Sequence, residues 1–204
     1  MKIICIADTH GFNSHMYYEL KDSDADVIIH AGDSLNYGTK SDAILFNNDF
    51  SRLPMKYKIV VAGNHDAILE TPNKFRFTDD IIYLQDSEVI IEGIKFFGSP
   101  WSKIFYNWAF MLPENKLAEK WAKIPLDTNI LITHSPPFGT LDYVLNRHGG
   151  SETLANHIKQ LKISHHIFGH IHESFGQVIK ENIHYINCSM LGDRKFNAPI
   201  DFTI

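Results

Sequence analysis

The stretch Ile59-Val60-Val61-Ala62-Gly63-Asn64-His65-Asp66 joins a short apolar run to a cluster of polar side chains. A run of this length, rich in β-branched residues, is typical of a strand buried on both faces. The same order recurs along the chain. Runs at 3–7, 27–30, 130–133 and 163–168 are followed by Asp8-Thr9-His10, Gly32-Asp33, Thr133-His134-Ser135 and Gly169-His170-Ile171-His172. Strands lying side by side would bring these distant polar residues to a single site.

Segments of helical character separate the apolar runs and lie at 14–21, 41–52, 113–123 and 151–161. Strands that alternate with helices predict parallel βαβ units. Further runs at 81–83, 88–91, 95–98, 175–180 and 184–187 predict meanders or hairpins, with a turn at Glu181-Asn182. We therefore expect an α/β fold with mixed sheets packed on one another and helices outside. Because no repeat or linker-like boundary is visible, we expect a single domain over residues 1–204.

The composition is that of an ordinary globular chain, with 44% hydrophobic and 21% charged residues. A formal net charge of −5 argues against extended contact with a nucleic-acid backbone. Small anionic substrates stay open, because bound metal ions reverse the local sign. Cys5 and Cys188 form no CxxC pair, so we expect buried, reduced thiols. The run at 3–7 is too short for a signal peptide or a membrane span, so we expect a cytoplasmic protein without membrane contact.

The clusters after the first two runs offer oxygen and nitrogen ligands. The spacing of Asp8 and His10 can direct a carboxylate and an imidazole at one cation, and the alternative is an ordinary turn. Asp33 follows a glycine, which permits close backbone approach, and its two oxygens can bridge two cations. On its own, a Gly-Asp pair is more often a turn.

The cluster that contains Asn64 is more unusual, because its amide oxygen is a reasonable neutral metal ligand. His65 beside it could stay unligated and transfer a proton. The alternative is a Gly-Asn turn with a capping Asp66.

The last two clusters add three imidazoles. His134 precedes two prolines, which fix the backbone after it. His170 and His172 would share one side of an extended segment, since alternate residues of a strand share a face. The other histidines lack this context and are expected to be surface or packing residues, with His30 as a possible supporting group and His148 at a possible pocket edge. These others are His15, His30, His148, His157, His165, His166 and His184.

At these residues the chain resembles the calcineurin-like metallophosphoesterases, whose pattern is D-x-H, G-D, G-N-H-[DE], a later [GT]-H and G-H-x-H. The resemblance implies a four-layer α/β/β/α sandwich with two mixed β-sheets and two metals above them. It implies Asp8, His10 and His172 as ligands of one metal. It implies Asn64, His134 and His170 as ligands of the other, bridged to the first by Asp33. His65 matches the family's proton-donating histidine.

A narrower resemblance, to the metallophosphoesterase-domain-containing branch, covers nearly the whole chain. It rests on 98–101, 107–110, 130–137, 168–173 and 186–189, with Pro199-Ile200 near the end. Members of that branch act as metal-dependent phosphodiesterases, including on 2′,3′- and 3′,5′-cyclic nucleotides. By the same resemblance Arg194 is the basic candidate near a phosphate, with solvated surface as the alternative.

Three positions depart from the wider family. Ala62 stands where phosphoprotein phosphatases carry an arginine, which speaks against a protein phosphatase. Asn36 occupies the place of the carboxylate that usually supports the catalytic histidine. Ser135 stands where the branch often has glycine.

The aromatic segment 101–110 could stack on a nucleobase or pack as a hydrophobic cap.

The sequence thus predicts a dinuclear metal-dependent phosphoesterase that hydrolyses small phosphodiesters by attack of a metal-bridging hydroxide. Cyclic nucleotides are one candidate class of substrate. His65 would be the proton donor, and Asn36, Asp66 and Arg194 are the supporting or substrate-binding candidates. Imidazoles, carboxylates and an amide favour two divalent ions of Mn, Fe or Zn over Mg or Ca. The expected partner is a small phosphoester or nucleotide. The enzymatic alternative is a phosphomonoesterase or nuclease on the same site, and the non-enzymatic alternative is a weakly catalytic metal-binding scaffold.

Overall fold

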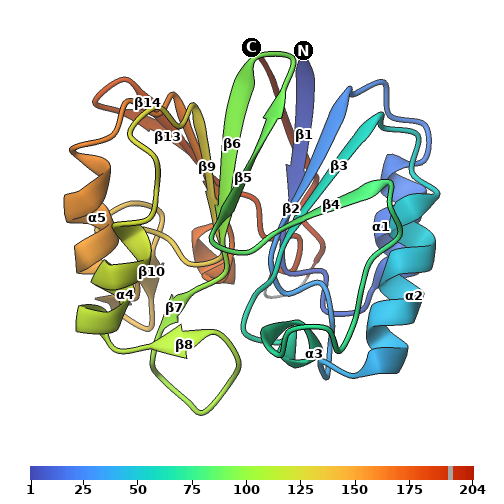
Figure 1. The fold of residues 1–204 in the computed structure, drawn as a ribbon, viewed down its shortest axis with the longest axis horizontal. Helices are drawn as coiled ribbons and strands as arrows, with labels where there is room; N and C mark the ends of the chain where they lie inside the picture. The colour runs from blue at the N-terminus through green and yellow to red at the C-terminus, as the bar shows by residue number, and fades with distance from the viewer. Residues whose placement is uncertain (193–194) are drawn as a thin grey trace.

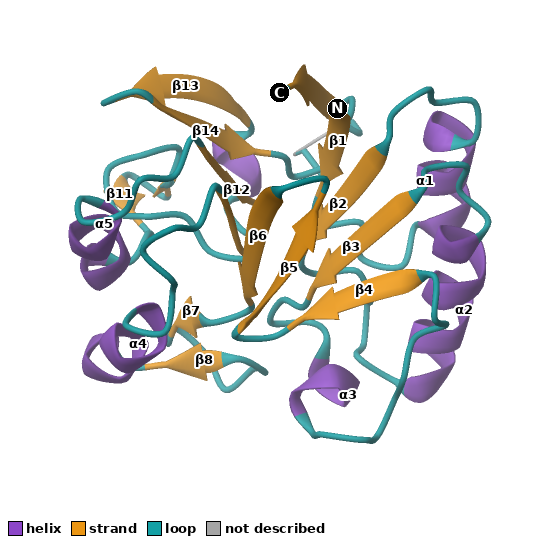
Figure 2. Ribbon diagram, turned by 45° about the horizontal axis from the view of Figure 1, so that its top comes forward, coloured by secondary structure: helices purple, strands orange, loops and turns teal. Residues whose placement is uncertain are grey.

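Two β-sheets pack face to face at the centre of the protein, in a computed structural model that describes residues 1–192 and 195–204 (Figure 1). The first sheet has the strand order β15-β1-β2-β3-β4, and the second has the order β13-β14-β12-β9-β6-β5. Helices cover the outer face of each sheet, so the layers run α/β/β/α (Figure 2). The expected four-layer arrangement of two mixed sheets is therefore confirmed.

The first sheet is built from the N-terminal half of the chain and one C-terminal strand. Its strands are β1 (Lys2–Ile6), β2 (Val27–Ala31), β3 (Tyr57–Val61), β4 (Ile81–Leu84) and β15 (Ile200–Thr203). Strands β1 to β4 are parallel, whereas β15 is antiparallel to β1. The carboxyl ends of β1, β2 and β3 therefore lie at one edge of the sheet.

The second sheet combines a parallel centre with antiparallel edges. Its strands are β5 (Ser87–Ile91), β6 (Ile94–Ser99), β9 (Ile130–Thr133), β12 (His165–Phe168), β13 (Gly176–Lys180) and β14 (Ile183–Asn187). β6, β9, β12 and β14 are parallel, and β5 and β13 are paired antiparallel to β6 and β14. The predicted turn at Glu181-Asn182 joins β13 to β14, and both residues have positive φ (50° and 62°), as a two-residue hairpin turn requires.

Adjacent residues of the central strands pack into different layers, because side chains alternate along a strand. Ile28 joins the cluster beneath the helices of the first sheet, whereas Ile29 lies between the two sheets. In the second sheet Leu131 packs toward helices and Ile132 toward the other sheet. Burial on both faces explains why these strands read as continuous apolar runs.

The four predicted helices are present as α1 (Asn13–Leu20), α2 (Lys40–Ser51), α4 (Glu114–Trp121) and α5 (Glu152–Ile158). Met16 and Phe46 of α1 and α2 pack on the first sheet, and Trp121 and Leu154 of α4 and α5 pack on the second. The Ser151 side chain caps α5 by accepting from the Leu154 amide at 3.1 Å. Pro113 is the residue before α4 rather than its first helical residue.

Several short elements were not predicted. They are α3 (Ala67–Glu70), the 3₁₀ helix η1 (His172–Ser174), β7 (Ser102–Lys103) paired with β8 (Met111–Leu112), and β10 (Tyr143–Val144) paired with β11 (Arg147–His148). The edge strand β15 was not predicted either. Strands of two residues show no periodicity that a sequence pattern could reveal. These elements matter because the loops that carry them surround the site described below.

Two further expectations concern the cysteines and the membrane. Cys5 and Cys188 are both buried and free, as expected. None of the helices within the described residues is long and apolar enough to cross a membrane.

Candidate metal centre

The predicted metal ligands come together where strands of both sheets end. The loop after β1 carries Asp8 and His10, and the loops after β2 and β3 carry Asp33 and Asn64. From the second sheet, β9 is followed by His134, and β12 by His170 and His172. Ligand atoms of Asp8, His10 and His172 lie within 4.8 Å of one another, and so do those of Asp33, His134 and His170. A third set, His10, Asp33 and His65, meets the same distance and overlaps the first two, so the described residues form two adjacent groups that share Asp33, with His65 beside the first. The assignment of each residue to one metal stays a prediction.

The first group brings two imidazoles to one carboxylate. The Nε2 atoms of His10 and His172 face each other at 3.4 Å. Asp8 Oδ1 lies 3.5 Å from His172 Nε2. A single cation between these atoms would accept lone pairs from all three side chains.

The second group is arranged around His134. Its Nε2 lies 3.0 Å from the amide oxygen of Asn64 and 3.4 Å from Asp33 Oδ1. The ring of His170 lies 4.9 Å from that of His134, centroid to centroid. An amide oxygen, a carboxylate and two imidazoles therefore surround one point.

Asp33 lies between the two groups. Its Oδ1 faces His134, whereas its Oδ2 lies 3.8 Å from His10 Nε2. The Oδ1 atom also accepts a hydrogen bond from the His65 amide at 2.7 Å, which fixes the rotation of the carboxylate. One oxygen thus points toward each group, the arrangement a bridging carboxylate needs.

The loops turn sharply to present these side chains. Asp8, His10, Asp33 and His170 all have positive φ, between 42° and 69°. Such conformations cost non-glycine residues on the order of 1 kcal/mol or more and cluster at functional sites. The expectation of an extended segment from His170 to His172 is wrong, because the chain bends at His170 and enters η1 at His172. The bend sends the two rings to different groups.

Main-chain and hydroxyl groups hold the ligands in place. The His134 Nδ1–H group donates to the Ala31 carbonyl oxygen at 3.0 Å, which leaves Nε2 as the atom available to a metal. The Asp8 Oδ2 atom accepts from the His170 amide at 2.9 Å and from the Ser189 hydroxyl. Sequence reasoning missed Ser189, since nothing in the sequence near residue 189 indicates a contact with residue 8.

The donor atoms fit a metal pair. Asp8 Oδ1 is buried and has no hydrogen-bond partner among the described residues. Leaving a buried carboxylate oxygen unpaired is costly, and a cation removes that cost. Two facing Nε2 atoms beside it form a set that borderline divalent ions prefer.

The charges within the groups shift the pKa values strongly. Burial is the largest single influence on the pKa of Asp33 and raises it, but the charge and hydrogen bond of His134 together with the charge of His10 outweigh burial and hold that pKa at about 2. Burial likewise lowers the pKa of His134, but the charge and hydrogen bond of Asp33, the charge of Asp8 and the Ala31 carbonyl together raise it to about 9. Burial lowers the pKa of His170 to about 4. Without metal, Asp33 and His134 are therefore an ion pair, and a cation must displace the proton of His134 to bind its ring.

His65 lies at the rim of the first group. Its ring packs against the rings of His10 and Trp108, with centroid separations of 4.4 Å and 4.6 Å. Its Nδ1 lies 2.9 Å from the main-chain carbonyl oxygen of Asn36. A backbone carbonyl therefore replaces the carboxylate of the wider family, and the exposed Asn36 side chain makes no hydrogen bond to His65 among the described residues.

Asp66 has a role other than the capping considered from the sequence. It precedes α3, but its side chain makes no cap there. Its carboxylate is buried and accepts from the amides of Gly63 at 2.7 Å and Leu35 at 2.8 Å. It thereby ties the loop of Asn64 to that of Asp33. Burial and the nearby Asp33 raise its pKa to about 7.

The remaining predicted positions lie in different places relative to the site. His30 is buried, and its Nε2 lies 2.9 Å from the Thr9 hydroxyl, so it supports the loop between Asp8 and His10. Ser135 is buried. His148 lines the cavity described next. Arg194 lies outside the described residues.

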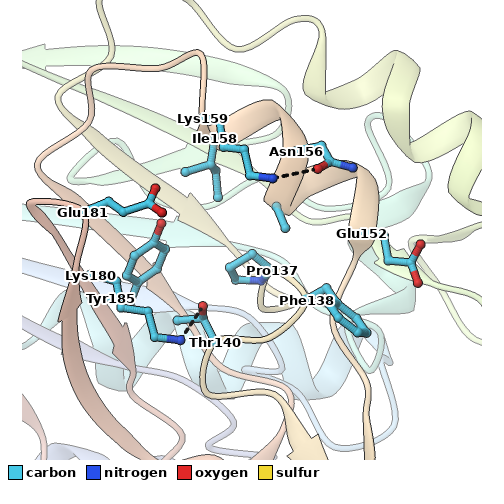
Figure 3. Close-up of a pocket in the computed structure, with 11 residues that line it drawn as sticks. Pro137, Phe138, Thr140, Glu152, Asn156, Ile158, Lys159, Lys180, Glu181 and Tyr185 are labelled. Atoms are coloured by element: carbon cyan, nitrogen blue, oxygen red, sulfur yellow. Dashed lines mark hydrogen bonds between the residues drawn. The ribbon is translucent and has the colours of Figure 1, made fainter.

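A cavity of about 810 Å³ opens beside the metal centre and includes His170 and His172 in its lining. The segment from Lys103 to Phe105 and the β10–β11 hairpin also line it. A second cavity of about 470 Å³ lies between α5 and the β13–β14 hairpin and contains none of the metal-ligand candidates (Figure 3). Its Lys180 Nζ already donates to the Gly139 carbonyl oxygen at 2.8 Å.

The aromatic segment predicted as a cap or a stacking surface divides into a buried part and an exposed part. Phe110 is buried, and its ring packs against that of Trp101 with the centroids 5.5 Å apart. Phe105, Tyr106 and Trp108 are exposed and cluster with one another, with Phe105–His170 ring centroids 6.1 Å apart. The exposed three are thus free to contact a ligand above the metal centre.

Comparison with known proteins agrees with this geometry. The family described as calcineurin-like phosphoesterase matches residues 1–174. A UPF0046 protein of Caenorhabditis elegans is 36% identical over 222 residues, covering 100% of this chain and 75% of the relative. The human metallophosphoesterase domain-containing protein 1 is 35% identical over 230 residues, covering 98% of this chain and 69% of its own.

Solved structures share the fold at lower sequence identity. The protein TT1561 of Thermus thermophilus superposes with a TM-score of 0.65 at 17% identity, covering 91% of this chain and 88% of its own. A hypothetical protein from the same organism gives a TM-score of 0.57 at 13% identity, covering 92% and 75%.

Proposed function

Because the chain belongs to the calcineurin-like phosphoesterase family, we propose that it is a dinuclear metal-dependent phosphodiesterase. Its substrates would be small organic phosphodiesters, with cyclic nucleotides as the first class to test. The observation that carries this proposal is Asp33, whose two oxygens face two separate groups of ligand-type side chains. Two neighbouring cations would supply stabilisation of both the attacking and the leaving oxygen, as in two-metal hydrolases.

Seven residues would hold the metals. Asp8, His10 and His172 would bind one ion, Asn64, His134 and His170 the other, and Asp33 both. When bound, the two ions supply Lewis-acid activation of the phosphoryl group and of the attacking water. Both sheets contribute ligands, so we further propose that residues 1–204 act as one domain.

Protein side chains would carry the remaining steps. The Asn36 carbonyl oxygen accepts a hydrogen bond from the Nδ1–H group of His65. When the ring is charged, the proton available for transfer therefore lies on Nε2. That proton would go to the departing alkoxide oxygen. Trp108 packs on the same ring and keeps part of it from water.

The surroundings of the site favour a small diester over a phosphoprotein. Ala62, buried before Gly63, offers no guanidinium to clamp a phosphomonoester dianion. The net charge of −5 disfavours long nucleic acids.

The test is an assay of protein reconstituted with Mn²⁺, Fe²⁺ or Zn²⁺. The substrates are bis(p-nitrophenyl) phosphate, p-nitrophenyl phosphate and a panel of cyclic nucleotides, with Asp33→Asn as the inactive control. Faster turnover of the diesters supports the proposal. A strong preference for the monoester would instead make the protein a phosphomonoesterase, and two bound metals without turnover would make it a binding scaffold.

A further inference from the structure

The cavity beside the metal centre is lined by two surface segments that the metal site does not use. One is the segment from Lys103 to Phe105, and the other is the β10–β11 hairpin. His170 and His172 line the same cavity. A molecule whose phosphoryl group binds the metals would therefore extend along these segments.

The hairpin is held firmly against the element that carries His172. The Tyr143 amide donates to the Ser174 hydroxyl oxygen at 2.9 Å, and that hydroxyl donates to the Tyr143 carbonyl at 2.9 Å. The buried Asp142 accepts from the Gly139 and Gly150 amides at 3.1 Å each and from His148 Nδ1 at 2.8 Å. The hairpin thus has a defined position relative to a metal ligand, as a recognition element requires.

The tip of the hairpin presents an apolar side chain in an unfavourable conformation. Leu145 and Asn146 form the two-residue turn between β10 and β11, with φ of 49° and 59°. Leucine rarely adopts positive φ, and glycine or asparagine is the usual residue at such a turn. Leu145 is 80% exposed and lines the cavity. Its side chain therefore contributes little to the fold and faces the space where a ligand would lie, as do the exposed Ile104 and Phe105.

Two cationic side chains line the same cavity. Lys103 and Arg147 take part in none of the ion pairs found within residues 1–192 and 195–204. Glu173 is the single carboxylate in the lining formed by the described residues. Ten of the sixteen other lysines and arginines among the described residues pair with a carboxylate. What distinguishes Lys103 and Arg147 is that both line one apolar-walled cavity beside the metal centre.

We propose that this cavity is a second substrate subsite, which takes an apolar arm ending in an anionic group such as a carboxylate or phosphate. This inference rests on the proposed function, because the metal centre is assumed to hold the scissile phosphoryl group. The apolar arm lies against Phe105 and Leu145. The terminal anion binds Arg147 and Lys103.

Calorimetry on Mn²⁺-loaded protein tests the subsite without turnover. The probes are phenylphosphonate and biphenyl-4-phosphonate, each with and without a carboxylate at the far para position, so that two arm lengths scan the cavity. An exposed ion pair contributes up to about 1 kcal/mol, so at one arm length the carboxylate should tighten binding roughly fivefold. Arg147→Gln and Lys103→Gln should each reduce that ratio, and the double variant should bring it to about one.

The matched control is Lys56→Gln, which removes one positive charge before β3, at the end of that strand opposite Asn64. It should leave the ratio of affinities with and without the carboxylate at its wild-type value.

Equal affinities with and without the carboxylate at both arm lengths would overturn the proposal. A carboxylate-dependent gain in affinity that persists in the double variant would also overturn it. Hydrolysis of bis(p-nitrophenyl) phosphate is measured separately. If the carboxylate tightens binding but the diester is not hydrolysed, the subsite is supported and the phosphodiesterase activity is refuted. If the diester is hydrolysed but the carboxylate does not tighten binding, the activity is supported and the subsite is refuted.

Discussion

The Nδ1 atom of His65 lies 2.9 Å from the main-chain carbonyl oxygen of Asn36. The orientation of the proposed proton donor therefore depends on the path of the loop after β2 and not on the side chain at position 36. That loop is in turn fixed by Asp66, which accepts hydrogen bonds from the Ser34 hydroxyl at 3.1 Å and the Leu35 amide at 2.8 Å.

Asn36→Ala should keep most of the activity. The variant retains the carbonyl group that holds His65, so kcat should stay within about threefold of wild type, well below the effect of losing a general acid. Steady-state kinetics on bis(p-nitrophenyl) phosphate provides the measurement. A loss above tenfold would assign the amide side chain a direct role.

His65→Ala should slow substrates with poor leaving groups far more than substrates with good ones. General acid catalysis is worth about 10²–10⁴ in rate, and a stable phenolate needs little of it. The comparison is turnover of an alkyl p-nitrophenyl phosphate against a dialkyl phosphate, with metal content measured in parallel. Equal losses on both substrates, with two metals still bound, would rule out proton donation to the leaving group.

Gly63→Ala should disrupt metal binding. A Cβ atom there would lie 2.3 Å from Asp33 Oδ1 and 2.7 Å from His134 Cε1, so the proposed bridging ligand must move. We expect fewer than two metals per chain and a large loss of kcat. Elemental analysis after dialysis gives the metal content.

Gly93→Ala controls for general destabilisation in that experiment. Gly93 has a φ of +84°, so alanine is strained there, but a Cβ would meet nothing within 4 Å. This variant should unfold more easily yet bind metal like the wild type. If Gly63→Ala also bound two metals normally, the site would be more tolerant than the distances indicate.

Buried His166 should make stability depend on pH. Burial lowers its pKa to about 3, below the ordinary value of 6.5, so the folded state prefers the neutral ring. Its stabilising contribution is complete above pH 6.5 and is lost as the pH falls toward 3, by up to about 1.4 kcal/mol per pH unit. Urea unfolding of metal-free protein between pH 7 and 4 should show a shallower decline in His166→Gln. Identical pH dependence in the two proteins would contradict this assignment.

Leu145→Gly should stabilise the protein. The leucine holds a φ of 49° with an exposed side chain, and relief of that strain is worth about 1 kcal/mol. Chemical denaturation should therefore show a higher free energy of unfolding, while the apolar phosphonates bind more weakly. A less stable Leu145→Gly protein would show that the leucine side chain supports the fold.

The sequence by itself was sufficient to locate ten of the strands, including all those that lead into the site, and the ligand-type residues that follow them. The run 59–62 is apolar throughout, and 27–30 is apolar except for His30, because both faces of the central strands are buried. Polar residues directly after such runs, as at Asp33 and Asn64, therefore stand out at strand ends. The four longer helices were equally visible, because segments of helical character separate the runs.

Contacts between distant segments were decided only by the tertiary structure. The Ser189 hydroxyl on Asp8 and the Asn36 carbonyl on His65 join residues whose identities indicate no such pairing. The bend at His170 and the two-residue strands around the cavity have no periodic signal. Burial patterns are local and repeat along the chain, whereas the geometry of a site depends on how separate loops meet. The sequence therefore determined which residues stand at the ends of the strands, and only the packing of the two sheets decided which of them face each other.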